Sequence, residues 1–418
     1  MQRETAEQIA TAVADRLASP SDARRLGVPQ GWHPQSLAFG AAGVALLHIE
    51  RARAGSGSWQ RAHDWLACAA AGQIESWEGS HLHYGVPAVA FALNAAADRP
   101  DTYARALGTL DRSITTTTRH RLARAHTRMD DGSERPALAE FDSIRGMTGI
   151  GAYLLRREPH GDLLRDILTY LVRLTDPVKD GGELLPGWWS DQAPSGKLST
   201  DYPGGHSNNG MAHGIAGPLA LLALAARRGI VVSGQLNAIN RICGWFDQWR
   251  QESRTGPWWP HLITRAQYRD GQPLATRPSR PSWCYGAAGL ARAQQLAAVS
   301  LADTARRQKA ESALATALTD PEQLSLTTDH SLCHGHGGMA HIAARASADA
   351  DAPDIGASIP NLLGHIGTSP DTIAAVLVER AGGDIGLLEG AAGVALVLHS
   401  AAAATAPLSG WDAFLLIG

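Results

Sequence analysis

A turn of the form G-x-x-G, followed each time by an apolar run, recurs along the chain. The runs are apolar on nearly every side, so each predicts a helix that is buried on most of its faces. Between them lie stretches with helical periodicity and one charged face, such as residues 301–318 with Glu311, which predict outer helices facing solvent. The seven copies begin at Gly40, Gly85, Gly146, Gly214, Gly286, Gly335 and Gly390.

A buried helix that alternates with an amphipathic one predicts a helical hairpin repeat. Seven such hairpins predict an all-α fold, an (α/α) toroid or barrel with inner and outer helix rings, formed by residues 1–418 as a single domain. The second copy departs from the pattern, because Ala88 replaces its second glycine. The alternative is chance recurrence in a chain rich in Gly and Ala, and the shared pattern of seven copies argues against it.

Two long segments, at about residues 177–210 and 254–282, interrupt the helical pattern. Both are rich in glycine or proline, and the second carries Trp258 and Trp259. Loops of this length in a compact domain are usually functional, so we expect loop excursions that form the rim of an active-site mouth. Surface excursions with packed tryptophans remain the alternative.

Composition narrows the class of protein. The chain has 418 residues, is 44% apolar and 18% charged, and carries a net charge of −3, which argues against nucleic acid as its main partner. There is no secretory signal, and the longest apolar run, residues 215–226, is shorter than the ~20 residues that cross a bilayer. We therefore expect a reduced, cytoplasmic protein in which Cys68 and Cys243 are small buried hydrophobic residues.

The candidate chemistry lies at the repeat turns. Cys284, Cys333 and His334 stand just before two of the leading glycines, so converging inner helices would bring them together. Two thiolates and an imidazole are ligands that zinc prefers, and three protein ligands leave a fourth position open, as in a catalytic site. Two alternatives stay open: two buried cysteines with a helix-capping histidine, and a structural zinc closed by His336.

His213 occupies the equivalent turn position of an earlier repeat. Asp142 precedes the next leading glycine upstream and could accept the second ring N–H of His213, or merely cap its own helix. Arg280 and Tyr285 flank the first candidate zinc cysteine, where either could stabilise a developing oxyanion or simply pack.

The motifs WCYG (from Trp283), CHG (from Cys333) and GMAHGIAG (from Gly210) resemble those of the lanthionine synthetase C family, the lanthipeptide cyclases. The resemblance covers nearly the whole chain and looks like a stand-alone class I cyclase. It implies a seven-fold α/α toroid with one zinc ion per chain. This sequence departs from the family pattern at Ala288, after WCYG, and at His336, after CHG.

By this resemblance the zinc ligands are Cys284, Cys333 and His334. The family's reaction adds precursor-peptide cysteine thiolates to dehydroalanine or dehydrobutyrine and so forms thioether rings. His213 and Asp142 would serve in proton transfer, and an arginine and a tyrosine at the places of Arg280 and Tyr285 line the site. In chain order, the candidate site residues are Asp142, His213, Arg280, Cys284, Tyr285, Cys333 and His334.

The expected partners are a dehydrated precursor peptide, with leader and core, and the dehydratase and transporter of the same pathway. That pathway would place the protein in the cytoplasm, or at the membrane through a biosynthetic complex. Two other functions use the same features: addition of glutathione to dehydroamino acids, and a non-enzymatic helical scaffold that holds zinc. A glycosidase would need paired carboxylates at the centre, whereas the turns offer mainly cysteine and histidine.

Overall fold

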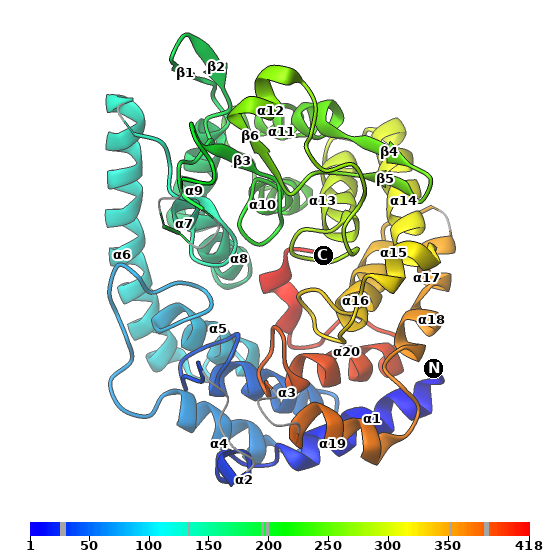
Figure 1. The fold of residues 1–418 in the computed structure, drawn as a ribbon. Helices are drawn as coiled ribbons and strands as arrows, with labels where there is room; N and C mark the ends of the chain where they lie inside the picture. Colours follow the sequence, from blue (N-terminus) through cyan, green and yellow to red (C-terminus); the bar gives the residue numbers. More distant parts are fainter. Residues whose placement is uncertain (26–30, 133, 194–195, 198–199, 352, 380–383) are drawn as a thin grey trace. The chain divides into compact units, whose positions relative to one another are not determined.

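The structure, a computed structural model, describes residues 1–25, 31–132, 134–193, 196–197, 200–351, 353–379 and 384–418 (Figure 1). The chain divides into two compact units. The first unit comprises residues 1–114 and 327–412, and the second comprises residues 115–326 and 413–418. The single domain expected from the sequence stays a prediction. None of the described helices is both long and apolar enough to cross a membrane.

All seven helices predicted from the G-x-x-G repeats are present, and each begins one or two residues after its leading glycine. They are buried on nearly every side, as their apolar sequences require. In the first unit α20 contacts both α3 and α16, and α3 contacts α5; in the second unit α10 contacts α8 and α13. These inner helices are α3 (Ala41–Arg53), α5 (Val86–Ala96), α8 (Met147–Arg157), α10 (Ala216–Arg227), α13 (Ala287–Ser300), α16 (His336–Ser347) and α20 (Ala391–Ala403).

The predicted outer helices pack against the inner ones: α4 on α3, α9 on α8, α11 on α10, α14 on α13, and α18 on α16. One expectation is wrong. Glu311 of α14 is buried rather than solvent-facing, because it accepts hydrogen bonds from Gln295 Nε2 and Arg307 Nε, each at 2.9 Å. The outer and connecting helices are α2 (Pro20–Arg25), α4 (Trp59–Ala69), α6 (Ala104–Asp131), α7 (Leu138–Phe141), α9 (Asp162–Leu174), α11 (Gln235–Trp249), α14 (Thr304–Thr319), α15 (Pro321–Ser325), α17 (Asp354–Ala357), α18 (Ile359–Gly364), α19 (Pro370–Glu379) and the 3₁₀ helix η1 (Trp411–Leu415).

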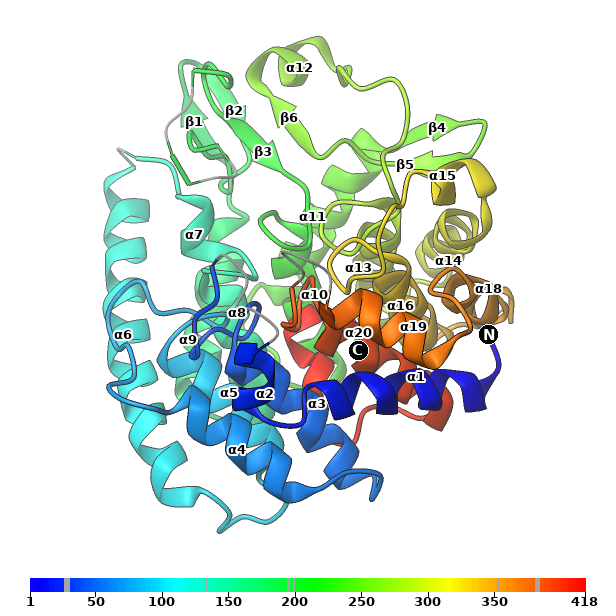
Figure 2. The same ribbon diagram turned by 60° about the horizontal axis from the view of Figure 1, so that its bottom comes forward.

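The last inner helix, α20, takes its outer partner from the other end of the chain. That partner is α1 (Arg3–Arg16), which lies along both α20 and α19 (Figure 2). Glu7 of α1 accepts a hydrogen bond from His399 Nδ1 of α20 at 2.8 Å and forms an ion pair with Arg51 of α3 at 2.9 Å. The amphipathic N-terminal segment thus completes the seventh hairpin.

The repeated glycines are explained by close backbone approach. A Cβ atom on the second glycine would meet the carbonyl oxygen of the residue six positions earlier, at 2.1 Å for Gly289 and Trp283, and at 1.9 Å for Gly393 and Leu387. Real Cβ contacts are never so short, so only glycine lets the helix start pack against its own turn. The same contact, at 2.0–2.1 Å, occurs at Gly43 and Gly338.

The second repeat lacks this contact and has a different turn. Its leading glycine, Gly85, has a φ of +76°, and none of the other six leading glycines has a positive φ. The altered backbone accounts for the tolerance of Ala88 where the other copies have glycine.

Backbone hydrogen bonds join neighbouring repeat turns within each unit. An amide two or three residues before one leading glycine donates to the carbonyl two residues before the leading glycine of an adjacent repeat. These bonds fix the positions of adjacent turns relative to each other, and therefore the positions of the side chains on those turns. The bonds run from Ser143 to Ala212 (3.0 Å) and Met211 to Cys284 (2.8 Å) in the second unit, and from Cys333 to Leu388 (3.0 Å), Leu387 to Ala38 (2.8 Å) and Leu37 to His83 (3.0 Å) in the first.

The two excursions that interrupt the helical pattern pair with each other. Strand β3 (His206–Asn208) of the first excursion is antiparallel to β6 (Leu262–Thr264) of the second, with Ser207 opposite Ile263. This sheet could not be predicted from the sequence, because strands of three residues are too short to show an alternation of apolar and polar positions. Residues 194, 195, 198 and 199 of the first excursion lie outside the described residues. The other strands form two hairpins, β1 (Val178–Asp180) with β2 (Glu183–Leu185), and β4 (Gln251–Ser253) with β5 (Gly256–Trp258).

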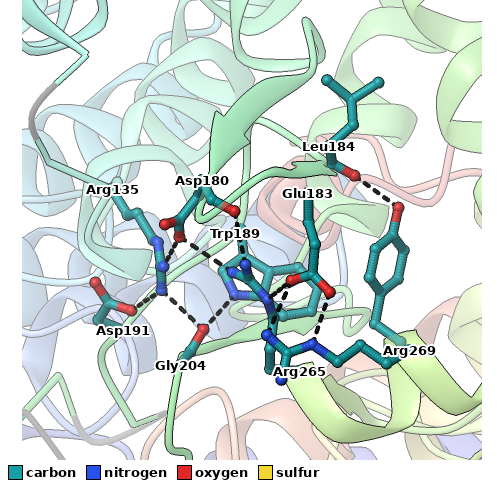
Figure 3. A network of polar contacts seen from close by, with 10 residues as sticks. Arg135, Asp180, Glu183, Leu184, Trp189, Asp191, Gly204, Arg265 and Arg269 are labelled. Atoms are coloured by element: carbon teal, nitrogen blue, oxygen red, sulfur yellow. Dashed lines mark hydrogen bonds and ion pairs between the residues drawn. The ribbon is translucent and has the colours of Figure 1, made fainter.

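An ionic network ties the β1–β2 hairpin to the second excursion (Figure 3). Arg265, at the start of α12 (Arg265–Asp270), is almost fully buried; it contacts Glu183 and lies 3.1 Å from Asp180. Arg269 lies 2.6 Å from Glu183, and Arg135 contacts Asp180. A buried guanidinium requires such carboxylate partners, and Asp180 and Glu183 of the hairpin supply them.

The close approach at the second glycine predicts the effect of a single methyl group. Gly289→Ala should lower the free energy of unfolding by about 1–3 kcal/mol, because the new Cβ forces α13 away from its turn. Gly244→Ala is the matched control: this exposed α11 glycine has nothing within 4 Å of the added Cβ, so alanine should raise stability by about 0.5–1 kcal/mol. Denaturant unfolding of both variants measures the difference; equal stability of the two variants would contradict the close-approach argument.

The ionic network predicts that the β1–β2 hairpin unfolds locally when its buried arginine loses its charge. Arg265→Met should leave Asp180 and Glu183 without their buried partner, so limited proteolysis should cut the β1–β2 hairpin several-fold faster. Arg254→Met removes an ion pair of an arginine that is 82% exposed, and should leave the cleavage rate unchanged. Equal cleavage rates in the two variants would show that the hairpin does not depend on Arg265.

Candidate active site and metal centre

The residue directly before each leading glycine defines one recurring position, which we call the turn position. The turn position directly follows the backbone segment that makes the inter-repeat hydrogen bonds. Its side chain is therefore held at the N-terminal end of an inner helix. Three of the predicted site residues, His213, Tyr285 and His334, occupy it. The full set is Phe39, Tyr84, Arg145, His213, Tyr285, His334 and Glu389.

In the second unit His213 and Asp142 are in direct contact. The Nδ1 atom of His213 lies 2.7 Å from Oδ2 of Asp142. Asp142 is almost fully buried, whereas the side chain of His213 is 25% exposed. An N–H at Nδ1 leaves the lone pair of Nε2 on the exposed side of the ring, which is the arrangement of a general acid or base held by a carboxylate.

The second oxygen of Asp142 has a separate, structural task. Its Oδ1 accepts hydrogen bonds from the backbone amides of Ile144, Arg145 and Gly146, at 3.1, 2.6 and 2.8 Å. Both alternatives raised for this residue are therefore realised, because one carboxylate caps the turn and also contacts the histidine. Ser282 and Ser331 hold the equivalent place in their repeats, where each hydroxyl accepts a hydrogen bond from a backbone amide of the turn.

Tyr285 and Arg280 lie in the turn that leads into α13, in the second unit. The Tyr285 hydroxyl accepts a hydrogen bond of 3.1 Å from Asn208 Nδ2, and its ring lies 5.1 Å from the ring of His261. Arg280 precedes Gly286 by six residues and directly follows Ser279, whose hydroxyl bonds His261. The roles of both residues in stabilising an oxyanion stay predictions.

In the first unit Cys333, His334 and Glu389 form a group that could hold a metal ion. One ligand atom from each lies within 4.8 Å of the other two, and His334 Nε2 is 3.7 Å from Glu389 Oε1. Cys333 is buried, His334 is half-buried and Glu389 is exposed, so the group opens to solvent on one side. Thiolate, imidazole and carboxylate are all zinc ligands.

Asp329 orients His334 toward this group. Its Oδ2 lies 2.7 Å from His334 Nδ1, and the Ser331 hydroxyl lies 3.3 Å from the same nitrogen. With Nδ1 occupied, Nε2 is the nitrogen that faces Cys333 and Glu389. Burial alone would raise the pKa of Asp329, but hydrogen bonds from His334 and Ser331 outweigh it and hold the pKa well below its usual range. An ionised carboxylate behind a ligating imidazole is the usual support of a metal-bound histidine.

Sequence reasoning missed Glu389 as a ligand. The signal was present, because Glu389 stands at the turn position of the seventh repeat, as His334 does in the sixth. His336 lies outside the group: its Nδ1 donates to the Asp329 carbonyl at 3.0 Å and its ring stacks on His365. Cys284 is buried in the second unit, with its Sγ 3.5 Å from the Ser282 hydroxyl, and its ligation of a metal stays a prediction.

The remaining two cysteines differ from each other. Burial raises the pKa of Cys243 to about 12, as expected for a small hydrophobic residue inside a helix pair. Cys68 is only half-buried, so the expectation of a fully buried residue is wrong there.

The model of the family described as lanthionine synthetase C-like protein matches residues 31–416. The chain belongs to this family. The WCYG and CHG motifs predicted membership of this family, and the match confirms that prediction. The matching residues include every candidate site residue, from Asp142 to Glu389.

Two relatives give this membership more detail. The chain is 26% identical over 266 residues to the nisin biosynthesis protein NisC of Lactococcus lactis subsp. lactis, a match that covers 62% of this chain and 60% of that protein. It therefore spans less than two thirds of the length of this relative. A solved structure of nisin cyclase is similar over the whole chain and 98% of its own length, with a TM-score of 0.78 and 20% identity. This likeness shows the fold and confirms the expected all-α class.

The Asp329 contact predicts a measurable effect on metal affinity. Asp329→Asn keeps an oxygen that can accept from His334 Nδ1 but removes the negative charge, so zinc affinity should fall about 10–100-fold. Competition with a chromophoric chelator measures the affinity. Asp354→Asn, on the exposed helix α17, is the matched control and should not change it. The same affinity in both variants would mean that Asp329 does not support the ligand.

Proposed function

We propose that this protein is a zinc-dependent lanthipeptide cyclase, which adds cysteine thiolates of a dehydrated precursor peptide to dehydroalanine or dehydrobutyrine. The observation that carries the proposal is the use of one recurring turn position for both parts of the chemistry. That position supplies a metal-facing histidine, His334, and a carboxylate-held histidine, His213. Family membership and the names of the two relatives support the same reaction.

The proposed zinc ligands are Cys284, Cys333 and His334, and Glu389 lies beside Cys333 and His334 as an oxygen donor that the substrate thiol would replace. The donor set fits zinc, because His334 turns Nε2 toward a thiol and a carboxylate while Asp329 occupies Nδ1. A bound zinc ion would lower the pKa of a coordinated substrate thiol, so that the thiolate is present near neutral pH. Solvent access beside Glu389 leaves room for that thiol.

The chain's own residues would then manage charge and protons. Addition of the thiolate to the β-carbon of the dehydroamino acid forms the C–S bond and places negative charge on the carbonyl oxygen as an enolate. Arg280 and the Tyr285 hydroxyl are the proposed donors to this oxygen. His213 then delivers a proton to the α-carbon, and Asp142 stabilises the imidazolium before transfer and holds the ring in place.

The proton count closes over one turnover. The substrate thiol releases one proton when it becomes a thiolate, and His213 returns one proton to the α-carbon. The net reaction is therefore the addition of S–H across a C=C bond, with no oxidant or reductant. The dehydratase that makes the substrate and the transporter that exports the product are the proposed partners, in a cytoplasmic biosynthetic complex.

The proposal predicts different losses in two variants. Cys333→Ala should lose most of its zinc, and with it thioether formation, because a buried thiolate ligand is gone. His213→Ala should keep about one zinc per chain but lower the rate of ring formation by about 10²–10⁴-fold, because only the proton donor is lost. Elemental analysis measures zinc, and mass spectrometry after thiol alkylation measures rings in a dehydrated class I precursor peptide.

Three outcomes would count against the proposal. A wild-type protein purified without chelators and free of zinc would remove the metal mechanism. Undiminished ring formation in both variants would remove the assigned residues. Addition of glutathione to free dehydroamino acids, without ring formation in the peptide, would identify the alternative activity.

A further inference from the structure

A cavity of about 390 Å³ lies in the second unit, between the two paired excursions. Tyr202 comes from the first excursion, and the remaining lining residues come from the second. Most of the lining is apolar or aromatic, and Arg277 is the charged residue among the lining side chains. The lining includes Tyr202, Trp258, Trp259, His261, Leu262 and Leu274.

The floor of this cavity is rigid. Trp258 and Trp259 are each 5% exposed, and Trp259 Nε1 donates to the Phe246 carbonyl of α11 at 2.9 Å. Tyr202 packs edge-on against His206 of β3, at a ring distance of 4.8 Å. Because β3 is paired with β6, the walls contributed by the two excursions are held together.

The rim carries an unusual exposed residue. Leu274 is 83% exposed, the most exposed large hydrophobic side chain among the described residues. A leucine in water beside an aromatic floor gains free energy when an apolar group covers both. The cavity therefore favours an apolar side chain over a charged one.

The backbone beside the cavity is suited to an extended peptide. Among the described residues β6 pairs with β3 alone. The His261 carbonyl accepts from the Asn209 amide on the β3 side, whereas the Thr264 amide donates to Gln267 Oε1, away from β3. Backbone groups alternate along a strand, so Leu262 directs its N–H and C=O to the same outer edge as Thr264. A peptide strand can bond there and place a side chain in the cavity.

The cavity adjoins the candidate active-site residues of the second unit through His261. His261 lines it, and the His261 ring lies 5.1 Å from the ring of Tyr285. The Nε2 atom of His261 is 2.7 Å from the hydroxyl of Ser279, the residue before Arg280. One side chain therefore separates the cavity from two residues assigned to the oxyanion.

We propose that this cavity is a specificity subsite, which binds an apolar side chain, such as that of Leu or Phe, of the peptide segment next to the reacting residue. This inference rests on the proposed function. The peptide lies extended along β6, and Leu274 folds over the bound side chain. The subsite thereby selects which segment of a flexible substrate is presented for ring closure.

The test uses short peptides of the form acetyl-Gly-X-Ser-Gly-amide, in which serine replaces cysteine so that binding does not depend on zinc. With X as Leu or Phe, the wild-type protein should bind about three- to tenfold more tightly than with X as Ser or Asp, as measured by calorimetry or ligand-observed NMR. Leu274→Asp should abolish this preference. Leu184→Asp changes another exposed leucine, on β2 and outside the cavity, and should retain it.

Each outcome decides a separate question. Equal affinity for all four peptides, or a preference that survives Leu274→Asp, overturns the subsite. Concentration-dependent dimerisation of the wild type that Leu274→Asp abolishes would assign the cavity to a second copy of this chain and also overturn it. A peptide preference in a protein that forms no rings leaves the subsite standing and removes the cyclase. If the wild type and Leu274→Asp form rings equally well, whatever the residue beside the cysteine, the cyclase stands and the subsite is removed.

Discussion

The close contact between a glycine and a carbonyl oxygen, present at the start of α3, α13, α16 and α20, is the constraint on which the rest of the structure depends. A Cβ at Gly338 would lie 2.0 Å from the Leu332 carbonyl, so the turn closes only without a side chain there. The closed turn then offers its amide and carbonyl to the neighbouring repeat, as Met211 does toward Cys284 at 2.8 Å. In these four repeats the second glycine is required because the turn has no room for a methyl group.

The same constraint explains where the chemistry lies. A side chain directly before the leading glycine is attached to a backbone that can hardly move, so His213 and His334 are held with little freedom of their own. Carboxylates then set their rings, Asp142 in one case and Asp329 in the other. The two histidines differ in what faces their second nitrogen, which is a thiol and a carboxylate for His334. One turn design thereby supplies the histidines for both proposed roles, metal binding and proton transfer.

The sequence predicted the helical part of the structure well and the excursions poorly. Seven helices could be located because glycine spacing and apolar runs are local signals. The pairing of β3 with β6 and the burial of Arg265 against Asp180 depend on contacts between distant segments, which leave no periodic pattern. Among the site residues, the Asp142–His213 contact was anticipated from the equivalent turns. Glu389 was missed as a candidate ligand because its turn position was the only signal, and its local sequence does not distinguish a ligating carboxylate from a solvated one.

The return of α1 to pack on α20 has a consequence for how the protein is made. Glu7 and His399 are in contact although 392 positions separate them. A ribosome releases α1 long before α20, so the first unit cannot bury α1 in its final place until α20 has emerged. The second unit is one nearly continuous stretch, residues 115–326, and can form most of its core earlier. The apolar face of α1 is exposed for that interval, which makes it the natural place for a chaperone to bind the nascent chain.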